Sequence, residues 1–175
     1  MPKIRKVMLA SLFLLFAVSV NAQKVNVGYD RTVNFSKFKT YAWTKGVPAR
    51  NPQVNQQILT LIDQQMSAKG LQKVTENADL NLSYHAAVID DFDSATVVQP
   101  NWVPGLGSMG QVWQVKRGTL IVVMKDAKAD AEVWRATAVE TMNQDWNKDV
   151  AKDPNKATAK VKKAIDKIFK AFPPK

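Results

Sequence analysis

Residues 79–89 (DLNLSYHAAVI) decide the fold, because apolar and polar side chains alternate along the whole stretch. One side of an extended chain carries Leu80, Leu82, Tyr84, Ala86 and Val88. The other side carries Asn81, Ser83, His85 and Ala87. Such alternation predicts a strand with one packed face and one more polar face, as in an antiparallel sheet that helices cover on one side.

Four further strands are predicted around this one. Residues 25–29 alternate, and residues 39–43 (KTYAW) are rich in aromatic and β-branched side chains. Residues 119–125 and 132–142 are apolar runs on either side of the polar turn 126–130, so they are expected to form a hairpin.

Two amphipathic helices complete the pattern. Asn51 and Pro52 form an N-cap and first-turn signal, apolar residues follow at helical spacing, and Gly70 suits the position just after the helix end. Asp153 and Pro154 repeat the start signal, and residues 173–174 (PP) end the second helix.

Together these elements predict a single α+β domain over residues 23–175, in the order β-β-α-β-β-β-α. Its sheet is expected to be mainly antiparallel with about five strands, and both helices are expected on one face. Residues 92–110 fit none of these elements. The segment contains several Pro and Gly residues as well as Trp102 and Met109, so it is expected to form a long loop.

The first 22 residues have the order of a secretory signal peptide. Lys3, Arg5 and Lys6 precede an apolar run at residues 7–20, and Ala22 ends a small-residue cleavage pattern. The run is short for a membrane-spanning helix, so cleavage near Ala22 and a periplasmic or secreted location are expected. An uncleaved N-terminal anchor remains the alternative.

The positive charge is concentrated at the C-terminal end. The full chain has 25 Lys and Arg against 15 Asp and Glu, a formal charge of +10. Residues 1–22 carry +3, residues 23–147 carry +1, and residues 148–175 carry +6. The charge is therefore a local feature of the last helix.

The residue inventory argues against catalysis. The chain has no Cys and one His, which excludes disulfides, thiol nucleophiles, Cys-ligated zinc and any site needing two imidazoles. His85 with Asp90, Asp91 and Asp93 leaves a hydrolase as a remote alternative, since no nucleophile and oxyanion donors accompany them. We therefore expect a non-enzymatic protein with no cofactor and no metal.

Short motifs in a fixed order resemble those of a bacterial family. They are YD at 29–30, NFSKFKTYAW at 34–43, NP at 51–52, AKG at 68–70, ADL at 78–80, YH at 84–85, GTLIV at 118–122, DA at 126–127, VWRA at 133–136 and PPK at 173–175. This order is similar to that of the domain-of-unknown-function 4136 family of bacterial envelope proteins, over nearly all of residues 23–175.

The resemblance implies an exported α+β domain, often a lipoprotein, without an established activity or agreed catalytic residues. This chain departs from many relatives because it lacks the lipobox Cys that would carry a lipid. A periplasmic protein without a lipid anchor is therefore expected.

The last helix offers one candidate binding surface. Five lysines share an arc away from its apolar side: Lys156, Lys160, Lys163, Lys167 and Lys170. They are suited to anionic lipid, lipopolysaccharide or another envelope protein, whereas the export signal argues against nucleic acid. A solvated helix face is the structural alternative.

The predicted loop offers the second candidate surface. Trp102, Met109 and Trp113 would form an apolar lip for a lipid, peptide or glycan. His85 lies on the more polar face of its strand, and Arg135 either neutralises a neighbouring acid or faces the open side of the sheet; both are further candidates for contact with a ligand or partner. Alternatively the rings cover the end of the sheet. The ligand and the oligomeric state are left open by the sequence.

Overall fold

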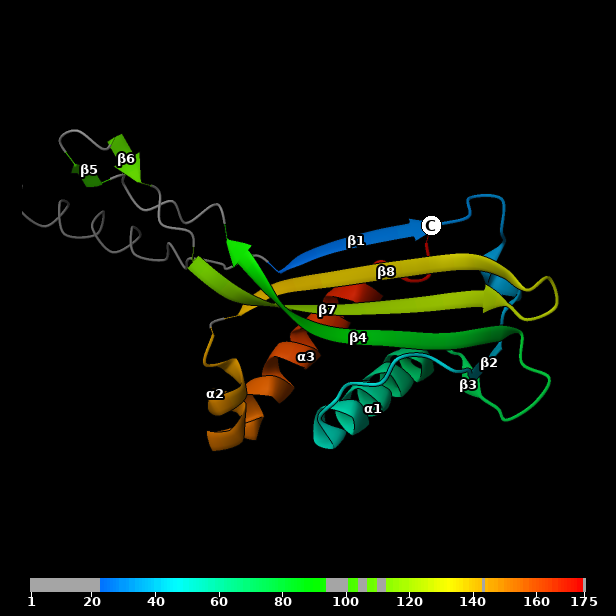
Figure 1. Ribbon diagram of the computed structural model, residues 1–175. Helices are drawn as coiled ribbons and strands as arrows, with labels where there is room; N and C mark the ends of the chain where they lie inside the picture. The colour runs from blue at the N-terminus through cyan, green and yellow to red at the C-terminus, as the bar shows by residue number, and fades with distance from the viewer. Residues whose placement is uncertain (1–22, 94–100, 104–106, 110–112, 143, 175) are drawn as a thin grey trace, which may run out of the picture.

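The computed structural model describes residues 23–93, 101–103, 107–109, 113–142 and 144–174. Within them a six-stranded sheet has the order β1-β8-β7-β4-β2-β3, and a separate two-stranded sheet pairs β5 with β6 (Figure 1). The predicted α+β class is confirmed. The predicted signal peptide lies outside the described residues.

The long antiparallel part of the sheet follows the alternation in the sequence. Its strands are β1 (Lys24–Tyr29), β4 (Leu80–Asp93), β7 (Trp113–Asp126) and β8 (Ala131–Met142). Leu82, Met124 and Trp134 face the same side in one row across β4, β7 and β8, and all three are fully buried. The predicted hairpin joins β7 to β8, and the Asp126 carboxylate accepts two backbone N–H groups of its turn.

A β-α-β unit forms the other edge of the sheet. Strand β2 (Thr40–Trp43) runs parallel to β4, and also parallel to the two-residue strand β3 (Gln72–Lys73). The helix α1 (Pro52–Ala68) lies between them in the chain and returns it to the starting end, as a parallel connection requires. The predicted, mainly antiparallel character of the sheet is confirmed by its three antiparallel pairings, while this parallel unit at its edge was not predicted from the sequence.

The ends of α1 form as its sequence predicts. The Asn51 side chain accepts from the N–H groups of Gln53 and Val54 at 2.9 and 3.1 Å. At the other end Gly70 adopts φ = +82°, a conformation that costs a residue without a side chain little. Ile58, Ile62 and Met66 on the inner side are buried against the sheet.

All three α-helices of the described chain lie on one side of the main sheet (Figure 1). Two were expected; the third, α2 (Trp146–Lys152), is a short helix before α3 (Pro154–Phe169). Helices α1 and α3 run side by side, linked by Gln57 to Thr158 and Gln65 to Asp166. The opposite face of the sheet is covered by no described helix, so it is an open face.

None of the helices described is long and apolar enough to span a membrane.

The predicted loop at residues 92–110 contains strands. Strand β4 continues to Asp93, β5 (Asn101–Val103) pairs with β6 (Gly107–Met109), and β7 begins at Trp113. Figure 1 places the β5–β6 pair beyond the ends of β4 and β7. These described parts do not lie over the open face of the sheet.

Candidate interaction surfaces

Helix α3 separates an apolar side from a basic side. Its start is fixed by the Asp153 carboxylate, which accepts from the N–H of Asn155 at 3.0 Å, with Pro154 in the first turn. The side facing the sheet is buried and consists of Ala157, Ala164, Ile165, Ile168 and Phe169. This burial orients the helix and directs the lysine arc away from the core.

Three lysines of the arc form an exposed row. Lys156, Lys163 and Lys170 lie seven residues apart and are exposed. At 1.5 Å per residue, neighbouring members of the row are about 10.5 Å apart along the helix. Among the described residues, no carboxylate forms a salt bridge with any of the three.

The other two lysines of the predicted arc are bound within the fold. Lys160 pairs with Glu140 of β8, and its ammonium lies 5.4 Å from the centre of the Trp146 ring. Lys167 donates to the backbone carbonyl of Gln23 at 3.2 Å. These contacts tie α3 to the sheet, so the two lysines have structural partners that the exposed row lacks.

An open depression lies along the outer side of α3. It has a volume of about 390 Å³, and its lining residues are Ala159, Lys162, Lys163, Asp166, Lys167 and Lys170. Asp166 provides its single negative charge and is paired with Lys162 at 2.5 Å. The depression is shallow, and the lysine side chains that line it include two members of the exposed row, Lys163 and Lys170, while Lys162 and Lys167 have partners in the fold. A second open depression, on α1, is lined by Asp63 and four uncharged residues.

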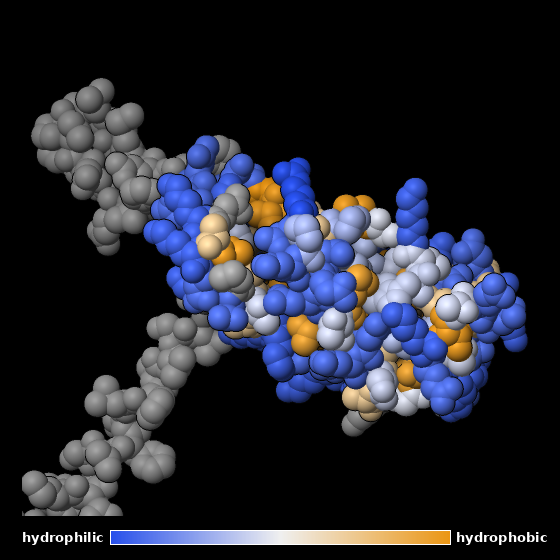
Figure 2. All heavy atoms as spheres, turned by 90° about the horizontal axis from the view of Figure 1, so that it is seen from below, coloured by the Kyte–Doolittle hydropathy of each residue, from blue (hydrophilic) through white to orange (hydrophobic). Residues whose placement is uncertain are grey.

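Outside α3, some of the described charges are paired with a neighbour and others, such as Lys39, Lys45 and Lys128, form no salt bridge among the described residues. In α2 the Lys148 ammonium lies 2.9 Å from the Asp145 carboxylate. This hydrogen bond lowers the pKa of Asp145 below its usual value and raises the pKa of Lys148. The face seen from below in Figure 2 is mostly hydrophilic, with hydrophobic residues in separate small patches.

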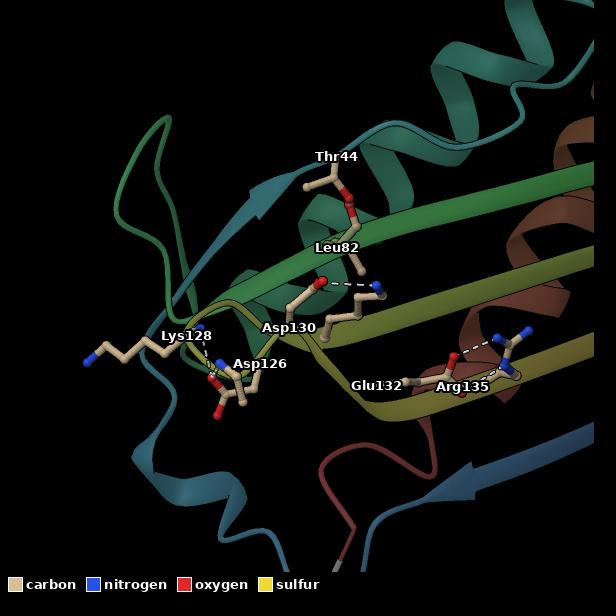
Figure 3. Close-up of polar contacts among 9 residues, drawn as sticks. Thr44, Leu82, Asp126, Lys128, Asp130, Glu132 and Arg135 are labelled. Atoms are coloured by element: carbon tan, nitrogen blue, oxygen red, sulfur yellow. Dashed lines mark hydrogen bonds and ion pairs between the residues drawn. The ribbon is translucent and has the colours of Figure 1, made fainter.

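His85 and Arg135 lie on the same open face of the sheet, on strands that β7 separates, and no contact joins them among the described residues. His85 of β4 is in one row with Ile121 of β7, and Arg135 of β8 lies one row away. Arg135 donates twice to Glu132 on the same strand, at 2.8 and 2.5 Å (Figure 3). The hydrogen bond from Arg135 lowers the pKa of Glu132, and the same contact raises the pKa of Arg135. Arg135 is therefore already paired with an anion of its own strand.

Two of the three acidic residues predicted to cluster after the strand, Asp90 and Asp91, do not converge on a site; the side chain of the third, Asp93, lies outside the described part of the structure. Asp90 pairs with Lys116 at 2.6 Å, and Asp91 pairs with Arg117. Successive residues of a strand point to opposite faces, so these two carboxylates are directed apart. Within the described residues no group of three or more metal-binding side chains comes together.

The aromatic lip stays a prediction. Trp102 lies in β5 opposite Ser108, Met109 lies in β6 opposite Asn101, and Trp113 begins β7. The side chains of Trp102, Met109 and Trp113 lie outside the described part of the structure.

The sequence pattern did not predict the groups that bind Lys160 and Lys167. Gln23 donates from its side-chain amide to Glu140 at 3.0 Å, and the same carboxylate pairs with Lys160. Gln23 and Glu140 are 117 positions apart in the chain, and Glu140 and Lys160 are 20 positions apart, so no local periodicity connects them. Lys162 was also missed in the depression, although its spacing of four from Asp166 is a recognisable helix pair.

Comparisons with known proteins agree on the fold and leave the activity open. A family model described as "Domain of unknown function (DUF4136)" matches residues 25–174. No curated protein matches the chain.

Two solved structures share the fold at low sequence identity. A PDZ domain protein from Parabacteroides distasonis matches with a TM-score of 0.59 and 13% identity over 87% of this chain, which spans 36% of that one. PelC from Paraburkholderia phytofirmans, solved as a dodecamer, matches with a TM-score of 0.51 and 13% identity, over 85% of this chain and 95% of that one.

Proposed function

The chain belongs to the DUF4136 family, whose domain has no assigned function, and from that premise we propose that it is an exported, non-enzymatic envelope module. Its role is to bind phosphate-bearing envelope lipids through the exposed lysine row of α3. The observation that carries the proposal is the row Lys156, Lys163 and Lys170, two members of which line a shallow depression.

Charge and spacing support an extended anionic surface as the ligand. Three ammonium groups at intervals of about 10.5 Å make a row roughly 20 Å long, which suits several separate phosphates better than one small anion. Each lysine near an anionic membrane surface contributes about 1 kcal/mol of attraction. Phospholipid headgroups and lipopolysaccharide share this phosphate chemistry.

The non-enzymatic part of the proposal is supported by where the candidate catalytic groups lie. His85 is on the open sheet face beside Ile121, and the Asp90 and Asp91 carboxylates are in ion pairs on opposite faces of β4. Catalysis of hydrolysis requires a nucleophile, a base and oxyanion donors within hydrogen-bond reach of one another. The described surroundings of His85 offer no such set.

Vesicle co-sedimentation tests the proposal. The triple variant K156Q/K163Q/K170Q is expected to bind vesicles containing anionic phospholipid at least tenfold more weakly than the native chain, because three attractive charges are removed. Neutral phosphatidylcholine vesicles should sediment neither protein. A parallel series with purified lipopolysaccharide separates the two phosphate sources.

The matched control removes the same charge elsewhere. Lys39, Lys45 and Lys128 are exposed and lie outside α3, so K39Q/K45Q/K128Q has the same net charge as the test variant. It is expected to bind within about twofold of the native chain, since only distant screened charges are lost. Equal weakening in both variants would reject a role for this row. The absence of vesicle binding by the native chain would also reject it.

A further inference from the structure

Strand β1 leaves one side of its backbone without a partner in the described structure. It lies at the end of the strand order, next to β8 alone. The N–H of Asp30 donates to the carbonyl of Val133 in β8 at 3.0 Å. Backbone groups alternate in direction along a strand, so the even-numbered residues of β1 bond to β8. Val25, Val27 and Tyr29 therefore direct their N–H and C=O groups outward.

The neighbouring residue supports this assignment. Gln23 has the same parity as Val25 and Val27, and its carbonyl is bound by Lys167 of α3 rather than by β8. Lys167 therefore satisfies the outward carbonyl of Gln23, and among the described residues no hydrogen bond is formed by the outward groups of the residues that follow in β1. The next three outward residues form a free ladder of hydrogen-bonding groups.

The edge has few of the features that usually prevent strand pairing. Proline, bulges, inward charges and very short length are the common protections. Strand β1 is six residues long, contains no proline, and has one charged residue, Lys24, at its beginning. The opposite edge, β3, has two residues and is protected by its length.

The structure assigns a partner to this edge: we infer that β1 pairs with β1 of a second copy of the chain, antiparallel, across a two-fold axis at Val27. In this register Val27 faces Val27 of the second copy, and Val25 faces Tyr29 of the second copy. All three have outward backbone groups, so they form hydrogen-bonded pairs. The inference does not rest on the proposed lipid binding.

Charge complementarity selects the register. With the axis at Val27, Lys24 of each copy lies opposite Asp30 of the other, which creates two symmetric ion pairs. A shift of the pairing by two residues would place Lys24 opposite Gly28 or Thr32 instead. Lys24 and Asp30 are both exposed. Oδ1 of Asp30 accepts from the N–H and the hydroxyl of Thr32 at 2.8 and 2.7 Å, so Oδ2 is the oxygen that faces Lys24 of the second copy.

The side chains on both faces of β1 fit the same register. On the open face Asn26 lies opposite Gly28 of the second copy, and a Cβ added at Gly28 would meet nothing within 4 Å. On the helix side Tyr29 is 40% exposed and would gain Val25 of the second copy as a neighbour. Closing the edge therefore covers an exposed aromatic ring without a steric conflict among these residues.

The axis is perpendicular to the sheet, so both copies keep their helices on the same side. Two lysines of α3 lie toward this side of the sheet. Lys160 is bound by Glu140, and Lys167 is bound by the carbonyl of Gln23. The contact consists of one strand per copy, so a weak and reversible dimer is expected rather than an obligate one.

Sedimentation velocity on the chain purified from the envelope fraction tests the pairing. The native chain is expected to dimerise reversibly with increasing concentration. K24E is expected to raise the dimer dissociation constant about tenfold, because two ion pairs become two repulsions. The double variant K24E/D30K reverses both charges and should return the constant to within about threefold of the native value.

A charge control and a register test complete the experiment. K39E introduces the same charge change away from β1 and should leave the dissociation constant unchanged. The chain has no cysteine, so mixing the N26C and G28C variants under oxidation should yield a disulfide-linked dimer far faster than either variant alone. Both positions are exposed and distant from the core, so both variants are expected to fold.

Three results would overturn the inference. One is a native chain that stays monomeric up to about 1 mM, where pairing would have negligible affinity; an edge that binds a different protein would give this result. The second is a dimer that K24E does not weaken or K24E/D30K does not restore. The third is a cysteine mixture that cross-links no faster than its separate components.

Discussion

Replacing Trp134 by alanine is expected to lower the free energy of unfolding by about 3–5 kcal/mol. Trp134 is fully buried near the start of β8, and its ring centre lies 5.9 Å from that of Phe169 and 5.3 Å from that of Phe172. The substitution removes the contacts that the Trp134 ring makes with Phe169 and Phe172, and it leaves a cavity that these two rings cannot fill. Urea denaturation followed by circular dichroism measures the change.

W134F is the matched control for this prediction. The indole Nε1 of Trp134 is buried and has no hydrogen-bond acceptor among the described residues. Phenylalanine keeps an aromatic ring and removes that unpartnered donor, so the loss of volume is partly offset. We expect W134F to cost under about 2 kcal/mol. A W134A cost below that of W134F would show that the cluster does not hold α3 to the sheet.

Replacing Asp63 by alanine is expected to cost about 3 kcal/mol of stability. One carboxylate oxygen of Asp63 accepts from the Tyr41 hydroxyl and from the Trp43 indole N–H, each at 2.8 Å. The other accepts from Lys73 at 2.9 Å. This single side chain of α1 therefore holds β2 and β3, and its loss leaves the donors of two largely buried rings unpaired.

D63N separates the hydrogen bonds from the charge. An amide oxygen can still accept from Tyr41 and Trp43, while the attraction to the exposed Lys73 is lost, so we expect D63N to cost under about 1 kcal/mol. Burial, with the hydrogen bond to Asp63 and its charge, raises the pKa of Tyr41 well above its usual value, so this hydroxyl stays a donor at neutral pH. Equal destabilisation by D63A and D63N, in the same urea denaturation experiment, would contradict the role of the hydrogen bonds.

Local signals in the sequence predicted most of the main sheet and two of its helices. The alternation at residues 79–89 and the cap signals at Asn51, Gly70 and Asp153 depend on near neighbours, and these elements form where expected. The domain family suggested by the motif order is confirmed.

The remaining features depend on contacts that local patterns do not contain. The parallel pairing of β2 with β4 is set by the packing of α1 beneath them, which no strand sequence specifies. Helix α2 has no side-chain hydrogen bond at its N-cap, Asp145, and is too short for an apolar stripe, so it gave no signal. Strands β5 and β6 have three residues each, within a segment rich in Gly and Pro.

The structure shows which lysines of the predicted arc have partners within the fold. Helical spacing placed five lysines on one arc, but spacing cannot show that Glu140 and Gln23, from the sheet, would bind Lys160 and Lys167. The structure therefore reduces the candidate anion-binding row to Lys156, Lys163 and Lys170, and it adds a depression that includes Lys162.

Acetylation footprinting of the native chain, with and without anionic vesicles, tests lipid binding by this row most directly. Mass spectrometry reports the acetylation rate at each lysine in one experiment. We predict that vesicles protect Lys156, Lys163 and Lys170, while the rates at Lys39, Lys45 and Lys128 stay unchanged. Vesicle-bound protein with uniform protection, or with protection confined to lysines outside α3, would contradict the proposed binding surface.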